Sequence, residues 1–244
     1  MNFSRITSET ALGKILRLPL RLLPRGTTVP ILQGPLKGKK WIVGSSDHGC
    51  WLGSYEHAKQ KLFIKHVPVG GTVFDVGAHV GFYTLLASQL VGESGHVAAF
   101  EPFPENAAFL RRHIDLNKFG NVSMFEAAVS DHDGTITFLE GPTRFTGKVD
   151  PSGGRSTRSV TLDTLVAQGE VPVPNLIKMD IEGAELGALK GAATILAQHR
   201  PTIFLATHGK DIHSQCCQFL GSLGYRLESL DGSPLEQVDE IIAR

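Results

Sequence analysis

The sequence is poor in cysteine and carries no net charge. Its 244 residues include three cysteines, and 24 Lys+Arg balance 24 Asp+Glu. Three cysteines, with Cys216 and Cys217 adjacent, make no disulfide framework, and no His or Cys lies at structural-zinc spacing. A neutral chain is not a general nucleic-acid binder, which needs clustered cations. We therefore expect a cytoplasmic, reducing location and no nucleic-acid partner.

Long apolar runs are also missing. No stretch approaches the roughly 20 apolar residues that span a bilayer. Residues 12–23 are apolar but are broken by three cations and Pro19, so they do not form the apolar centre of a signal peptide. Hydrophobic residues still make up 41% of the chain, which excludes a disordered protein. The length fits one domain with an appendage or two small domains.

The charge is unevenly distributed along the chain. Residues 1–40 hold eight Lys and Arg but a single acid, a charge of +7 that the remaining residues balance with −7. This basic end is suited to an acidic partner or an anionic membrane surface. The plainer alternative is that its cations pair with the acidic body of the same chain. Residues 8–18 predict a short basic amphipathic helix within it.

From residue 70 onward, strand-like and helix-like segments alternate. Strands are expected at 72–76, 96–101, 122–125, 176–180 and 202–206, helices at 82–90, 104–117, 184–196 and 212–223, an extra strand pair at 135–139 and 158–162, and final strands at 225–227 and 238–241. This alternation predicts an α/β fold with a doubly wound, mostly parallel Rossmann-like sheet. Ligands bind at the carboxyl ends of such strands.

The chain is thus predicted to have two parts. Residues 1–68 form an N-terminal cap, with strands at 28–32 and 40–43 and a helix from Ser54 to about His66, and residues 69–244 form the main domain. The Gly- and Ser-rich stretch 141–158 is expected to be a loop that covers a pocket.

A glycine-containing turn follows the first strand of the main domain, in the run Asp75-Val-Gly-Ala-His-Val-Gly-Phe-Tyr-Thr84. Such a turn lets a nucleotide approach the backbone. The dinucleotide fingerprint G-x-G-x-x-G does not fit, because His79 stands where its second glycine would be. Asp75 at the strand end would repel a pyrophosphate and suits a cationic ligand. Both features argue against a nicotinamide-dependent oxidoreductase.

A second acid, Glu101, ends the next strand. It lies 20 residues beyond Gly81, about the spacing at which an acid accepts hydrogen bonds from ribose hydroxyls. Either acid alone fits a solvated loop. Asp75 and Glu101 in register across one strand-helix-strand unit favour S-adenosylmethionine over NAD.

The ends of the fourth and fifth strands carry the candidate catalytic groups. Lys178 within a central strand needs a partner, so it either forms an ion pair with Asp180, Glu182 or Glu185 or faces the cleft. His208 could take a proton from a hydroxyl nucleophile. Asp180 and His208, with Glu182, could instead hold Mg²⁺ or Mn²⁺, an alternative that we do not favour.

These segments together resemble the FkbM-type S-adenosylmethionine-dependent methyltransferases. The resemblance covers about residues 70–210 and rests on the turn after Asp75, Phe100-Glu-Pro-Phe-Pro-Glu-Asn, Thr161-Leu-Asp-Thr-Leu, Ile177-Lys-Met-Asp-Ile-Glu-Gly-Ala-Glu and Leu189-Lys-Gly-Ala. It implies O-methylation of hydroxyls on sugars or natural-product scaffolds. The chain departs from the family pattern at Ala206, where an acid commonly precedes Thr-His.

The resulting hypothesis is methyl transfer from S-adenosylmethionine to a hydroxyl of a small molecule, saccharide or natural-product scaffold. Two alternatives stay open: a nicotinamide-dependent oxidoreductase, against which Asp75 speaks, and a non-catalytic module that binds S-adenosylmethionine. Asp180, His208 and Lys178 are the candidate catalytic residues. Cofactor binding is assigned to Asp75, Gly77, Ala78, His79, Gly81, Tyr83, Thr84, Glu101, Pro102, Asp180 and, from the cap, Glu56, with Trp51 and Tyr55 bordering the pocket. The oligomeric state and the acceptor are left open.

Overall fold

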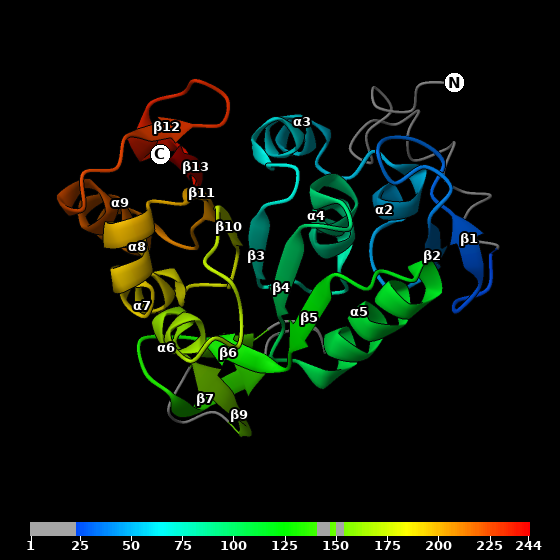
Figure 1. Cartoon of the computed structure of the whole chain (residues 1–244), viewed down its shortest axis with the longest axis horizontal. Coiled ribbons are helices and arrows are strands. Elements are labelled where there is room, and N and C mark those ends of the chain that lie inside the picture. Colours follow the sequence, from blue (N-terminus) through cyan, green and yellow to red (C-terminus); the bar gives the residue numbers. More distant parts are fainter. Residues whose placement is uncertain (1–22, 141–146, 150–153) are drawn as a thin grey trace.

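A seven-stranded sheet forms the centre of the molecule (Figure 1). The computed structural model describes residues 23–140, 147–149 and 154–244. The sheet order is β12-β13-β11-β10-β3-β4-β5, with β3 at Thr72–Val76, β4 at His96–Phe100, β5 at Val122–Phe125, β10 at Leu176–Met179, β11 at Thr202–Ala206, β12 at Leu227–Ser229 and β13 at Glu240–Ala243. The strands from β11 to β5 are parallel, and β13 is antiparallel to both neighbours. The predicted doubly wound, mostly parallel α/β sheet is confirmed.

Helices cover both faces of this sheet (Figure 1). Helices α4 (Phe82–Val91) and α5 (Pro104–Asn117) lie on one face, and α7 (Glu185–Lys190), α8 (Ala193–His199) and α9 (Lys210–Ser222) lie on the other. Side chains alternate between the faces along each strand. Val73 and Leu176 therefore share a core cluster with Leu85 of α4, whereas Phe74 and Ile177 pack in a second cluster with Leu189 of α7.

The order of the strands creates a switch point in the middle of the sheet. The chain winds outward from β3 to β4 and β5, and then returns to β10 on the other side of β3. Crossover connections consequently leave in opposite directions at the carboxyl ends of β3 and β10, which is where doubly wound sheets bind ligands. Asp75 and Lys178 are direct neighbours in the β3–β10 register and share the face that α4 covers.

A smaller sheet lies beside the carboxyl edge of β4 and β5. Its order is β6-β9-β7-β8, with β6 at Ala127–Val129, β7 at Gly134–Glu140, β8 at Gly147–Val149 and β9 at Arg155–Val160, and α6 (Leu162–Ala167) follows. The antiparallel β7–β9 pairing corresponds to the strand pair expected at 135–139 and 158–162. However, β9 begins at Arg155, inside the stretch 141–158 that was expected to be a loop, and ends at Val160. The sequence patterns did not indicate β6 and β8, which are three residues each.

The described part of the N-terminal segment, residues 23–68, packs on the α4 side of the large sheet. It consists of β1 (Thr28–Pro30), β2 (Lys40–Ile42), α2 (His48–Leu52) and α3 (His57–His66). Phe63 meets the rings of Tyr83 and Phe204 edge-on at centroid distances of 5.1 and 5.6 Å. Trp41 stacks on His113 of α5 at 4.0 Å. These contacts place the segment in the same hydrophobic core as α4.

Three predicted helices differ from the structure or lie outside it. The helix expected at 184–196 is divided into α7 and α8 at Gly191, where a side chain would collide with the backbone oxygen of Ser130. The helix expected from Ser54 begins at His57, preceded by the separate helix α2. Residues 8–18 lie outside the described residues. In the ranges that the structure describes, no helix combines the length and apolar composition needed to cross a membrane.

Candidate active site

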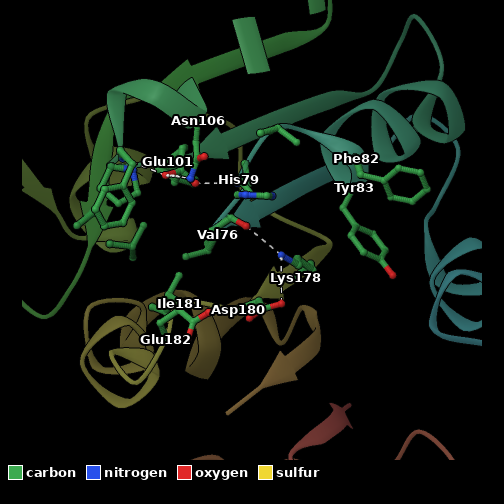
Figure 2. A pocket seen from close by; sticks show the side chains of 18 of the residues that line it. Val76, His79, Phe82, Tyr83, Glu101, Asn106, Lys178, Asp180, Ile181 and Glu182 are labelled. Atoms are coloured by element: carbon green, nitrogen blue, oxygen red, sulfur yellow. Dashed lines mark hydrogen bonds and ion pairs between the residues drawn. The ribbon is translucent and has the colours of Figure 1, made fainter. Parts of the chain in front are cut away.

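A cavity of about 300 Å³ opens at the carboxyl edge of β3, β4 and β10, at the switch point (Figure 2). The turn after β3, the ends of β4 and β10, the small sheet and the N-terminal segment all contribute to its wall. Its lining includes Ser46, Cys50, Tyr55, Glu56, Gly77, Ala78, His79, Tyr83, Glu101, Pro102, Phe103, Asn106, Val129, Phe138, Lys178, Asp180, Ile181 and Glu182. Among the predicted cofactor residues, Asp75, Gly81 and Thr84 lie outside this lining.

The turn after β3 is shaped by close backbone contacts. The amides of Gly77 and Ala78 both donate to the carbonyl oxygen of Phe100, at 3.0 and 2.9 Å. Gly77 has φ +79°, and a side chain there would collide with the backbone oxygen of Asp180. Glycine is therefore required by the approach of the chain after β10. Because these two amides are already bonded, the turn does not offer them to a phosphate group.

Glu101 is a buried carboxylate in the wall of the cavity, with 3% of its surface exposed. One oxygen accepts the amide of His79 at 2.7 Å, and the other accepts the amide of Phe103 at 2.9 Å and Asn106 Nδ2 at 3.2 Å. Burial raises the pKa of Glu101 to about 7, although these donors oppose the shift. The carboxylate is thus fixed in orientation and close to its ionisation point at neutral pH.

Asp75 and Thr84 lie behind the cavity wall. Asp75 is 1% exposed, and its Oδ2 accepts the Thr84 hydroxyl at 2.6 Å. Its Oδ1 lies 3.5 Å from Lys178 Nζ, so its cationic neighbour belongs to the protein. Asp180, Glu182 and Glu185 were the expected partners of Lys178. The structure places Asp75 closest, with Asp180 at 4.0 Å.

Lys178 contacts both Asp75 and the turn that follows β3. Its Nζ donates to the backbone oxygen of Gly77 at 3.0 Å, and Figure 2 shows it between this turn and Asp180. The side chain is 6% exposed and lines the cavity. One ammonium group therefore fixes the ends of β3 and β10 relative to each other.

Asp180 and His208 come together at the ends of β10 and β11. His208 Nε2 lies 3.7 Å from Asp180 Oδ1 and 3.7 Å from Glu182 Oε2, and its Nδ1 bonds Glu185 Oε1 at 2.8 Å. Burial would raise the pKa of Asp180, but the charges of Lys178, Lys59, His208 and His79 outweigh burial and lower it. The hydrogen bond to Glu185, aided by the other two carboxylates, raises the pKa of His208.

His208 lines a second, more open hollow next to the cavity. This hollow lies between the end of β11, α9 and the segment before β13, and its volume is about 1140 Å³. Its lining includes Thr207, His208, Lys210, His213, Gln218, Glu236, Gln237 and Asp239. Since Asp180 and Glu182 line the first cavity and approach the His208 ring, His208 stands at the border of the two spaces.

The predicted metal alternative is tested by the arrangement of these ligands. Within residues 23–140, 147–149 and 154–244, no group of three or more His, Cys, Asp or Glu side chains is placed to hold a metal ion. Asp180, Glu182 and His208 are near neighbours, with His208 Nε2 at 3.7 Å from an oxygen of each carboxylate.

The N-terminal segment supplies part of the cavity wall through Tyr55 and Glu56. Glu56 Oε2 accepts the Tyr83 hydroxyl at 2.8 Å and lies 3.5 Å from Lys59 Nζ, which also pairs with Glu240 of β13 at 2.5 Å. Trp51, which was expected to border the pocket, is buried outside the lining. Helix α2 contributes Cys50 instead, one residue earlier in the chain.

Several apolar wall residues were not foreseen from the sequence. Phe103 and Phe138 meet at a centroid distance of 5.2 Å, and Ile181 lines the wall after β10. Phe103 could have been predicted to line the cavity, because it follows Glu101 by two residues at the end of β4. Phe138 comes from β7, and only the packing of the small sheet brings it to the cavity.

The cavity is acidic. Of the described residues that line it, four are acids, Glu56, Glu101, Asp180 and Glu182, whereas Lys178 is the one Lys or Arg. Lys178 is already paired with Asp75 behind the wall. The remaining field favours a ligand with net positive charge and disfavours a pyrophosphate.

The chain belongs to the FkbM methyltransferase domain family, whose model matches residues 75–227. This confirms the resemblance seen in the sequence, and the match spans both the turn after β3 and the ends of β10 and β11.

Comparison with individual proteins adds two relatives and one solved structure. Hexuronic acid methyltransferase AglP from Haloferax volcanii is 32% identical over 138 residues, 56% of each chain. Methyltransferase 1 from Beauveria bassiana is 25% identical over 51% of this chain and 59% of that protein. The solved structure of methyltransferase FkbM from Methylobacillus flagellatus KT aligns with 18% identity and a TM-score of 0.49, covering 81% of this chain and 55% of that one. The matched part thus spans little more than half of each relative.

Proposed function

We propose that this protein transfers a methyl group from S-adenosylmethionine to a hydroxyl oxygen of a small molecule or saccharide. The observation that carries the proposal is the buried carboxylate of Glu101 in the acidic cavity at the switch point. Its position at the end of β4 suits the two hydroxyls of a ribose. The family supports methyl transfer.

The chemistry of the cavity wall fits this cofactor. Phe103, Phe138 and Ile181 give an apolar surface for a flat base, and Glu101 supplies the acceptor for ribose hydroxyls. Asp180 and Glu56 offer negative charge to the cationic end of the molecule. Bound S-adenosylmethionine supplies a methyl group on a sulfonium, which is already activated for transfer. The protein then has to align the acceptor and exclude water.

His208 and Asp180 are the proposed groups for acceptor activation. The acceptor lies in the second hollow, with its hydroxyl at the border that His208 forms. His208 Nε2 accepts the hydroxyl proton, and Asp180 orients the hydroxyl. A saccharide acceptor is supported by the relative that is named a hexuronic acid methyltransferase. Lys178 acts through the turn by holding Gly77 and Asp75 in place.

We further propose that residues 1–68 act as a cap on the catalytic domain at 69–244. Tyr55 and Glu56 at the start of α3 reach the cavity, and the bond from Tyr83 to Glu56 joins the cap to α4. A bound cofactor would thereby be shielded from water on this side. A cytoplasmic location stays a prediction. Contact of the basic N-terminal end with membranes also stays a prediction, since residues 1–22 lie outside the described residues.

Calorimetry with three ligands tests the cofactor assignment. We expect S-adenosylmethionine and S-adenosylhomocysteine to bind and NAD⁺ to show no heat, because the acidic wall and the occupied amides of Gly77 and Ala78 disfavour a pyrophosphate. Binding of NAD⁺ in place of the other two would contradict the proposal and favour an oxidoreductase.

A methyl-transfer assay tests the acceptor class. The protein is incubated with radiolabelled S-adenosylmethionine and a panel of neutral glycosides, uronic acids and simple alcohols. Transfer to a hydroxyl gives a methyl ether that survives mild alkali, whereas transfer to a uronic carboxylate gives an ester that releases methanol. Binding of the cofactor without transfer to any acceptor would instead favour a non-catalytic binding module.

Replacement of Glu101 by Ala should weaken S-adenosylmethionine binding by about 1.5–3 kcal/mol, the range for hydrogen bonds to a charged group. Because the ionised carboxylate is the better acceptor for ribose hydroxyls, wild-type affinity should fall as the pH drops below about 7, the pKa of Glu101. Calorimetry between pH 5.5 and 8.5, with Glu105→Gln in the first turn of α5 as a charge-matched control, measures both effects. Unchanged affinity in Glu101→Ala would remove the ribose assignment.

A further inference from the structure

Glu185 is a buried acid that the proposed reaction leaves without a role. It is the first residue of α7, and its side chain has no exposed surface. Its Oε1 accepts the amide of Gly183 at 3.0 Å and bonds His208 Nδ1 at 2.8 Å. Its Oε2 is buried without a hydrogen-bond partner among the described residues. Within the described ranges, the one basic side chain that forms a contact with Glu185 is the imidazole of His208.

The hydrogen bond fixes how His208 can act. A carboxylate only accepts hydrogen bonds, so Nδ1 must carry the proton in the bond to Glu185. In the neutral ring Nε2 is then the unprotonated nitrogen. It is also the nitrogen that faces Asp180 and Glu182 at the border of the cavity, at 3.7 Å from each. Glu185 therefore selects both the tautomer and the orientation that place a free lone pair at the border.

We propose that Glu185 is a positioning residue for His208, holding its Nδ1 proton so that Nε2 is the atom that takes up a proton from the acceptor hydroxyl. The catalytic part rests on the proposed function, whereas the tautomer can be measured without any acceptor. The charged groups around the ring are Glu185 of α7, Asp180 after β10 and Glu182 in the following turn. On proton uptake by Nε2, the positive charge forms next to these three carboxylates.

Nuclear magnetic resonance of the histidine rings tests the proposal in the full-length protein. Long-range proton–nitrogen spectra report the tautomer and titration of each ring, and His208→Asn identifies the His208 signals. In the wild type, neutral His208 should carry its proton on Nδ1. In Glu185→Leu, which removes the acceptor at similar volume, the population should move to the Nε2-protonated form, and the pKa of His208 should fall.

Glu182→Gln is the matched control. It also removes one carboxylate near the ring, but Glu182 lies 3.7 Å from Nε2 and makes no bond to Nδ1. The pKa of His208 should fall here as well, while the Nδ1 tautomer is kept. Wild-type tautomer and titration in Glu185→Leu would overturn the proposal, as would equal tautomer shifts in the two variants.

Two additions keep the result clear. If Glu185→Leu does not fold, the isosteric Glu185→Gln must still lower the pKa of His208, and an unchanged titration would contradict the proposal. With an acceptor from the methyl-transfer panel, Glu185→Leu should lower kcat about 10²-fold or more, with unchanged S-adenosylmethionine affinity. If no acceptor in the panel is methylated, the proposed function is refuted. The tautomer of His208 is measured without an acceptor and still tests the role of Glu185.

Discussion

His208→Ala is expected to lower kcat by about 10²–10⁴, the usual contribution of a general base. The affinity for S-adenosylmethionine should change little, because His208 borders the second hollow and does not line the first cavity. Since only the neutral ring can accept a proton, the wild-type rate should rise with pH through the pKa of His208 and level off above it. The three neighbouring carboxylates, Glu185 first, raise this pKa above its ordinary value.

The measurement is a pH profile of kcat with a saturating acceptor, with and without EDTA. His199→Ala, an exposed histidine at the end of α8, is the control variant and should behave like the wild type. Loss of activity in EDTA with recovery in Mg²⁺ or Mn²⁺ would assign hydroxyl activation to a metal. Full activity of His208→Ala in EDTA would exclude both mechanisms and leave alignment, with or without Asp180, as the source of catalysis.

The large sheet could be predicted closely because its strands are short buried runs separated by helices. The expected strand 72–76, helix 104–117, strand 122–125 and strand 202–206 agree with the structure residue for residue. The helix predicted at 184–196 failed because its break depends on a contact with another part of the chain. Gly191 fits against the backbone of Ser130, and helical periodicity carries no information about that contact.

The candidate site was predictable in position but not in contacts. Because the carboxyl ends of parallel strands lie at one edge of the sheet, Glu101, Lys178, Asp180 and His208 were predicted to lie near one another. The structure places them at that edge. Whether they bind cofactor or acceptor stays a prediction. The acid that pairs with Lys178 is set by the register of β3 and β10, which sequence patterns do not reveal. This register places Asp75 beside Lys178 on the same face of the sheet. Glu185 was noted only as a nearby acid, and its bond to His208 depends on how α7 packs beside β11.

Breaking the buried ion pair of Lys178 and Asp75 should strongly lower the free energy of unfolding. Asp75 is 1% exposed and Lys178 is 6% exposed. Lys178→Met keeps most of the apolar stem but leaves the Asp75 carboxylate buried without a cation. Removal of one partner of a buried ion pair typically costs about 3–5 kcal/mol, because the other charge remains uncompensated. The bond from Nζ to Gly77 is lost in addition, which loosens the turn after β3.

A double-mutant cycle separates the charge from the packing. Asp75→Asn keeps an acceptor for the Thr84 hydroxyl without the charge, so Lys178→Met combined with Asp75→Asn should be more stable than Lys178→Met alone. The free energy of unfolding is measured in urea at pH 7. Lys61→Met, at an exposed position of α3, should stay within about 0.5 kcal/mol of the wild type. Equal stability of Lys178→Met and the wild type would show that the pair does not hold β3 and β10 together.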